Sequence, residues 1–147
     1  MGTAAINTNV ELLNFIYKNA EMGKQTLPQL LEVCEDASFR EVILSQLREY
    51  QEICEAAASM AREEHQEAKG IGAMAKISSY LSVNMNTMID KTSSHLAEMM
   101  MQGSNMGIIE ITQKLREYGD ADGAVLALGQ KLLKTEERNL EQLKKFL

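Results

Sequence analysis

Four side chains in this sequence are candidates for holding a metal ion: Glu21, His95, Glu98 and Glu136. Glu136 is the most informative, because it continues the apolar spacing of Leu133 and Leu140 instead of interrupting it. A carboxylate that faces a helical core needs a cation, a hydrogen-bond donor or a shifted pKa. The residue pattern leaves three interpretations of Glu136: a metal ligand, a structural ion pair, or solvation near the end of a bundle.

His95 and Glu98 lie three residues apart, so on a helix they share one face. Pairs at this spacing are more often surface contacts than ligand pairs, and the neighbours of Glu98 on its face are polar. Glu21 and His95 each flank an apolar stripe, so either side chain could lean toward the core. Metal binding by these residues would require their side chains to converge.

Methionines form the second unusual group: Met99, Met100, Met101 and Met106. Thioether side chains are flexible and polarizable, and they suit both irregular cores and adaptable binding surfaces. Three consecutive helical residues point in three directions, so we expect one or two of the three to be exposed. Core filling and a contact with another protein both remain open for this cluster.

The composition of the chain is that of a helical protein. It has 147 residues, one proline and no tryptophan, and 45% of its residues are hydrophobic. Apolar residues recur at steps of three and four, the period of a buried helical face. We predict a single all-α domain over residues 1–147, with helices at about 8–35, 38–68, 73–89, 93–118 and 121–146.

Capping patterns set several of these boundaries. Thr8 followed by Glu11, and Ser38 followed by Glu41, are typical capping boxes at helix starts. Pro28 falls inside the first helix, which we expect to continue through it with a bend. The apolar face predicted for the last helix consists of Leu126, Gly129, Leu133, Leu140, Leu143 and Leu147.

Long helices joined by short links predict a four-helix bundle. Residues 73–89 decide its topology. As a separate helix of ~25 Å, they could carry the chain back along the bundle, so that the second and third long helices run parallel. Fused with the following helix, they would give a plain up-down-up-down bundle. We favour the crossover, because a continuous helix over 73–118 would leave half its length unpacked.

Charge and hydropathy exclude several classes of partner. The formal net charge of −6, with no basic patch, argues against nucleic acid. No apolar run approaches ~18 residues, so we expect no membrane span, and the first residues do not follow a signal-peptide pattern. Cys34 and Cys54 fall at apolar positions, which favours reduced core thiols and a cytoplasmic location.

Four segments carry a resemblance to a known group of bundles. They are Leu12-Leu13…Asn19-Ala-Glu-Met-Gly23, Leu47-Arg-Glu-Tyr50, His95-Leu-Ala-Glu98…Gly103, and Leu132-Leu-Lys-Thr-Glu136-Glu-Arg-Asn-Leu140. With the crossover at 70–90, they resemble the ferritin-like superfamily, and within it a bacterial branch of small bundle proteins. The resemblance implies a ferritin-like four-helix bundle with a helical crossover between the second and third long helices.

Di-iron members of that superfamily take a Glu from two helices and a Glu-x-x-His motif from each of the other two. This chain has no Glu-x-x-His; its nearest form is reversed, from His95 to Glu98. We therefore expect a non-catalytic bundle without a cofactor, acting through self-association or protein–protein contacts. The alternative is an iron or manganese oxidase or storage protein that uses Glu21, His95, Glu98 and Glu136. A small-molecule pocket between helices would leave no sequence signature.

Overall fold

The computed structural model describes residues 3–64 and 90–147 of the chain. Four α-helices and no strand occur in these two stretches, which confirms the predicted all-α bundle. The elements are α1 (Thr3–Val33), α2 (Ala37–Glu63), α4 (Ser93–Glu117), α5 (Gly123–Leu143) and the 3-10 turn η2 (Lys144–Phe146). The helix expected at 73–89 lies outside the described residues. The helix expected at 38–68 ends earlier than predicted, at Glu63, with Glu64 as its C-cap.

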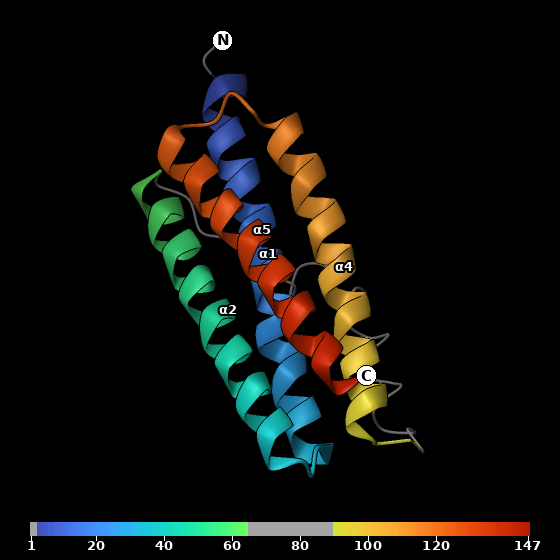
Figure 1. The fold of residues 1–147 in the computed structure, drawn as a ribbon. Coiled ribbons are helices and arrows are strands. Elements are labelled where there is room, and N and C mark those ends of the chain that lie inside the picture. Colours follow the sequence, from blue (N-terminus) through green and yellow to red (C-terminus); the bar gives the residue numbers. More distant parts are fainter. Residues whose placement is uncertain (1–2, 65–89) are drawn as a thin grey trace.

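The four helices pair as two antiparallel hairpins, α1 with α2 and α4 with α5 (Figure 1). The hairpins pack on each other through contacts of α1 with both α4 and α5, and of α2 with α5. Figure 1 also shows that α2 and α4 run in the same direction. This parallel course is the one that the crossover topology predicts.

Two helix starts differ from the capping patterns in the sequence. α1 already begins at Thr3, so Thr8 lies within the helix and does not cap it. Asp36, and not Ser38, caps α2: its carboxylate accepts a hydrogen bond from the backbone N–H of Phe39 at 3.2 Å. A short acidic side chain just before the first turn satisfies one of the free N–H groups there, and Asp36 stands in that position.

The start of α4 agrees more closely with its expected range. Thr92 caps α4 by accepting from the backbone N–H of His95 at 3.2 Å. At the same end of the bundle the Ser93 hydroxyl donates to the Asp36 carboxylate at 3.2 Å, which links the starts of α2 and α4.

The opposite end of the bundle is held by Asn9 of α1. Its side-chain oxygen accepts from the backbone N–H of Asp122 at 2.8 Å, and its amide donates to the Asp122 carboxylate at 2.9 Å. Asn9 is buried, and the two bonds satisfy both ends of its amide. They tie α1 to the first turn of α5.

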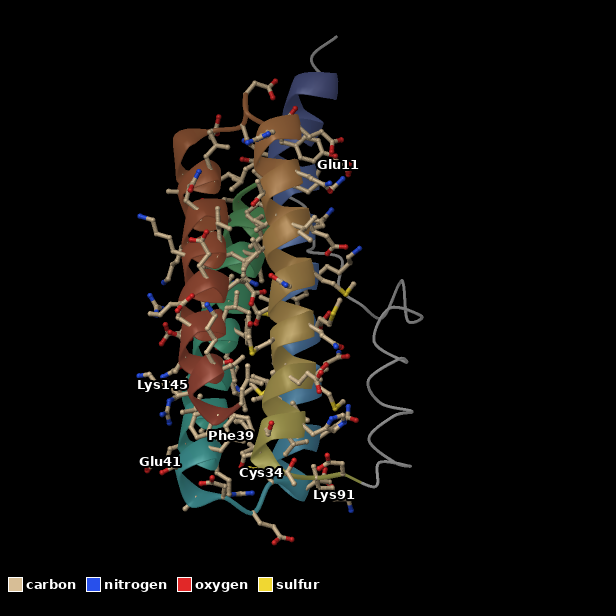
Figure 2. All side chains as sticks on the ribbon, turned by 45° about the vertical axis from the view of Figure 1, so that its right-hand side comes forward. Glu11, Cys34, Phe39, Glu41, Lys91 and Lys145 are labelled. Carbon is tan, nitrogen blue, oxygen red and sulfur yellow. The ribbon has the colours of Figure 1, made fainter. Side chains whose placement is uncertain are left out.

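Aliphatic, aromatic and cysteine side chains fill the space between the helices. Phe39 is fully buried and stacks on Phe146 of η2 with ring centroids 4.6 Å apart, whereas Glu41 and Lys145 point outward (Figure 2). Cys34 and Cys54 are both buried free thiols. None of the described helices is long and apolar enough to cross a membrane.

The buried face of α5 includes Gly129 and Leu143, as predicted, but its other positions are shifted by about one residue from the predicted face. Leu132 is fully buried, while Leu133 and Leu140 are only half-buried and Leu147 is exposed. The core-facing positions of α5 are Val125, Leu128, Gly129, Leu132, Thr135, Glu136, Asn139 and Leu143. The prediction followed the leucines, but three polar side chains take core positions on this helix and hide its true apolar stripe.

Candidate functional site

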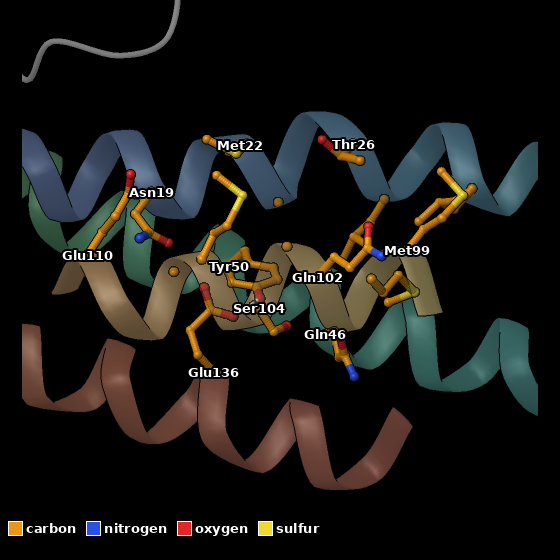
Figure 3. A pocket seen from close by; sticks show the side chains of 17 residues that line it. Asn19, Met22, Thr26, Gln46, Tyr50, Met99, Gln102, Ser104, Glu110 and Glu136 are labelled. Carbon is orange, nitrogen blue, oxygen red and sulfur yellow. Dashed lines mark hydrogen bonds between the residues drawn. The ribbon is translucent and has the colours of Figure 1, made fainter. Parts of the chain in front are cut away.

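A cavity of about 410 Å³ lies between α1 and α4, with α2 and α5 closing its inner side (Figure 3). Its walls are mostly apolar, and a few polar side chains converge on it. The residues that line it are Asn19, Met22, Gly23, Thr26, Leu27 and Leu30 of α1, Gln46 and Tyr50 of α2, Met99, Met100, Gln102, Gly103, Ser104, Met106, Gly107 and Glu110 of α4, and Glu136 of α5.

Glu136 and Tyr50 meet at the inner side of this cavity. The Tyr50 hydroxyl donates a hydrogen bond to Glu136 Oε1 at 2.5 Å, joining α2 to α5 (Figure 3). Ser104 of α4 supplies a second hydrogen bond to the same carboxyl group. Only 3% of Glu136 is exposed, and the Tyr50 side chain is buried as well. Three helices therefore hold one carboxyl group in place.

Burial shifts the pKa values of both groups upward. Loss of water raises the pKa of Glu136 to about 7; the hydrogen bonds from Tyr50 and Ser104 oppose this rise, and the negative charge of Glu49 adds to it. Burial, and then the neighbouring Glu136 carboxylate, raises the pKa of Tyr50 well above its usual value. Tyr50 therefore keeps its proton and stays a hydrogen-bond donor at neutral pH.

Two glycines make room for this pair. A Cβ atom on Gly107 would lie 2.4 Å from Glu136 Oε2, and a Cβ on Gly23 would lie 2.6 Å from the Tyr50 ring. Real Cβ atoms do not approach other atoms so closely, so α4 and α1 reach the pair only because these positions lack side chains. Gly103 differs, because a Cβ there would meet nothing within 4 Å. Gly103 thus faces unfilled space in the cavity.

The cavity opens toward the outer side of α4. Met106 is 57% exposed, Gln102 is exposed, and Met22 and Glu110 are half-buried. Deeper in the bundle, Met99 and Met100 are buried, while Met101 is half-buried and packs against the core. The expectation that one or two of the three consecutive methionines would be exposed is therefore wrong, and Met106 is the exposed member of the cluster.

The remaining metal candidates lie apart from Glu136. Glu21 of α1 accepts a hydrogen bond from Tyr17. His95 Nδ1 lies 3.5 Å from Glu98 Oε1 on the outside of α4, where the Glu98 side chain is 59% exposed. His95 precedes Ser104 by nine residues, which is roughly 13 Å along a helix. The structure places the His95–Glu98 pair on the surface and only Glu136 in the core.

A ferritin-like metal centre needs several carboxylate and imidazole groups around one point. Within residues 3–64 and 90–147, no three His, Cys, Asp or Glu side chains gather closely enough to hold an ion. Glu136 has a tyrosine and a serine as neighbours, and hydroxyl donors of this kind suit a carboxyl group better than they suit a shared cation. The described residues therefore do not fit a di-iron centre.

Several lining residues were missed by the sequence reasoning. Neither Tyr50 nor Ser104 was among the candidate site residues identified from the sequence. Gly107 lets α4 approach Glu136 closely, whereas a Cβ on Gly103 would meet no described atom within 4 Å. The sequence did contain a signal for the Tyr50–Glu136 pair. A tyrosine and a glutamate that both fall on buried helical faces each need a hydrogen-bond partner, and each can supply one to the other.

Comparison of this chain with protein-family models, with curated proteins and with solved structures gives no match.

Proposed function

We propose that this protein is a non-catalytic helical bundle that binds a small organic molecule in the cavity between α1 and α4. The observation that carries the proposal is the cavity itself: about 410 Å³, mostly apolar, with a buried carboxyl group on its inner wall. Ligand sites in proteins are usually apolar cavities of ~300 to 1,000 Å³ with a few fixed polar groups.

The volume limits the size of the ligand. An apolar cavity of ~150 Å³ in another protein is enough to bind benzene. By that proportion, the present cavity accommodates a molecule of roughly 15 non-hydrogen atoms. Such a ligand would bury most of its surface, and the apolar walls would supply most of the affinity.

Gly103 provides a direct test of ligand binding. A Gly103→Leu side chain would extend into the cavity without meeting another atom at its Cβ, so the fold should tolerate it. The matched control is Gly123→Leu, at the exposed start of α5, where a Cβ likewise meets nothing within 4 Å.

The probe is 2-phenylethanol, and its binding is measured by isothermal titration calorimetry. We expect it to bind the wild-type protein and Gly123→Leu with similar affinity. Gly103→Leu should bind it at least about tenfold more weakly, because the side chain occupies the space. Equal binding by all three proteins would place the ligand elsewhere, and binding by none would remove the proposed function.

A second candidate function is self-association through the outer face of α4. Met106 and Ile109, three residues apart on this helix, are 57% and 56% exposed. Large apolar side chains exposed side by side are typical of contact surfaces. We expect Ile109→Lys to dissociate any dimer seen by light scattering, and Leu44→Lys on α2 to leave it intact. A monomer at all concentrations would exclude this candidate.

The resemblance to ferritin-like bundles remains a proposal about ancestry and topology. It is supported by the parallel course of α2 and α4 (Figure 1). The iron or manganese alternative gains no support from the positions of Glu21, His95, Glu98 and Glu136.

A further inference from the structure

The charged side chains among the described lining residues of the cavity are all acidic. Two carboxyl-bearing side chains line it, Glu136 on the inner wall and Glu110 near the opening, and no basic side chain is among its described lining residues. The chain as a whole also carries a formal net charge of −6. In a space with low-dielectric walls, such an arrangement favours the entry of cations over anions.

Glu136 has hydrogen-bond donors but no cationic partner in the part of the chain that the structure describes. Its contacts are the hydroxyls of Tyr50 and Ser104. The neighbouring Glu49, by contrast, forms an ion pair with Arg138 at 2.7 Å. A carboxylate can accept about four hydrogen bonds, so two donors leave Glu136 with unused acceptor capacity.

The surrounding walls suit the apolar body of an organic cation. Met22, Met99, Met100 and Met106 contribute soft thioether groups, and Tyr50 contributes an aromatic ring. Polarizable sulfur and aromatic faces interact favourably with alkylammonium groups, and they also bury hydrocarbon. A metal ion would lack ligands here, whereas an ammonium group needs only one carboxylate and an apolar surface.

We infer that the ligand of this cavity is a small organic monocation, with its ammonium group at Glu136 and its apolar body among the methionines. The inference rests on the proposed function, because it presumes that the cavity is a ligand site. It adds the chemical class of the ligand and the residue that recognises its charge.

Proton linkage follows from the position of the ammonium group. The titratable groups that face Glu136 are Tyr50 and Glu49 of α2, and Glu110 of α4 lines the same cavity; Ser104 of α4 and Asn19 of α1 are neutral. Burial raises the pKa of Tyr50 well above its usual value, so Tyr50 keeps its proton. The cation binds to the ionised form of Glu136. When Glu136 is protonated before binding, it therefore releases one proton as the cation binds.

Three probes of similar size test the charge of the ligand: 2-phenylethylammonium, 2-phenylethanol and phenylacetate. Calorimetry at about pH 8 should show the cation binding at least about tenfold more tightly than the alcohol, and the anion binding most weakly. Between about pH 8 and about pH 6 the affinity for the cation should fall roughly tenfold, since Glu136, with a pKa of about 7, becomes protonated. The affinity for the alcohol should change little.

Glu136→Gln separates charge recognition from binding. Glutamine has nearly the same shape and keeps an acceptor for the Tyr50 hydroxyl, so the variant should fold and bind 2-phenylethanol like the wild-type protein. It should bind the cation no better than the alcohol, and without dependence on pH. Glu110→Gln is the matched control for a more exposed carboxylate, and it should keep most of the preference for the cation.

The outcomes distinguish the two proposals. If the alcohol binds as tightly as the cation, and Gly103→Leu abolishes both, the cavity is a ligand site but the inference about charge is wrong. If the preference for the cation survives in Glu136→Gln, another residue recognises the charge and the assignment to Glu136 is wrong. If no probe binds the wild-type protein, the proposed function and the inference both fail.

Discussion

The hydroxyl of Tyr50 and the carboxyl group of Glu136 lie 2.5 Å apart, although the two residues are separated by 86 positions in the sequence. The pair joins the α1–α2 hairpin to the α4–α5 hairpin at the level of the cavity. It provides a buried, hydrogen-bonded polar contact between the two hairpins, so it affects the stability of the fold as well as ligand recognition.

Glu136→Gln should change how stability depends on pH. The folded-state pKa of about 7 lies above the usual 4.5, so the folded protein binds more protons and loses stability as pH rises between these values. The loss amounts to about 3 kcal/mol when it is complete. Glutamine does not titrate, so the variant does not lose this stability as the pH rises. Urea unfolding should show equal stabilities below about pH 4.5 and a more stable variant at about pH 8. A constant difference across this range would contradict the raised pKa.

Tyr50→Phe should destabilise the protein most when Glu136 is ionised. The substitution leaves a buried carboxylate oxygen without its donor, at a cost of about 1.5 to 3 kcal/mol at alkaline pH and less at acidic pH. Tyr17→Phe is the matched control, since Tyr17 is only half-buried and bonds to Glu21. Its cost should stay below about 1 kcal/mol. Similar losses in both variants would show that the Tyr50–Glu136 contact has no special weight.

Alanine substitutions at three glycines should change the stability of the fold in different directions. Gly103→Ala should stabilise the protein by up to about 1 kcal/mol, because alanine favours helix and its Cβ meets no atom. Gly107→Ala and Gly23→Ala should destabilise it, since their Cβ atoms would displace the Glu136 carboxyl group and the Tyr50 ring. Thermal unfolding of the three variants tests this, and a stabilised Gly107→Ala would show that the carboxyl group is free to move away.

The two cysteines should react only when the protein opens. Cys34 and Cys54 are buried, and burial raises the pKa of both thiols, that of Cys54 to about 11. The thiolate is the reactive form, so native protein should react with iodoacetamide far more slowly than protein in urea. Rapid labelling of either cysteine in the native protein would contradict its position in the core.

Helical period was enough to predict the class of fold and the approximate ranges of the described helices. Both predicted capping boxes were wrong, because α1 begins at Thr3 and Asp36 caps α2. The direction of α5's buried face was not predictable in the same way. Leu133 and Leu140 outline an apolar stripe around Glu136 in the sequence, yet Leu132 and Asn139 are the residues buried beside Glu136. Polar residues that bond inside the core resemble surface residues when hydropathy alone is considered.

The cavity could not have been predicted from sequence either. It exists because Gly103 leaves space beside α1 and because Gly107 lets Glu136 approach α4, two opposite consequences of the same residue type. Glu136 was identified correctly as a carboxylate within an apolar face. Its donor, Tyr50, is 86 residues away, and only the packing of α2 against α5 brings the two together.

The most direct test of a ligand site in this cavity is a titration of the protein, labelled with ¹³C at its methionine methyl groups, with 2-phenylethylammonium. The methyl resonances of Met22, Met99, Met100 and Met106, which line the cavity, should shift as the probe is added. Met60 on α2, outside the cavity, should not shift, and Gly103→Leu should show none of these changes. Unchanged resonances in the wild-type protein, or shifts that persist in Gly103→Leu, would contradict the account.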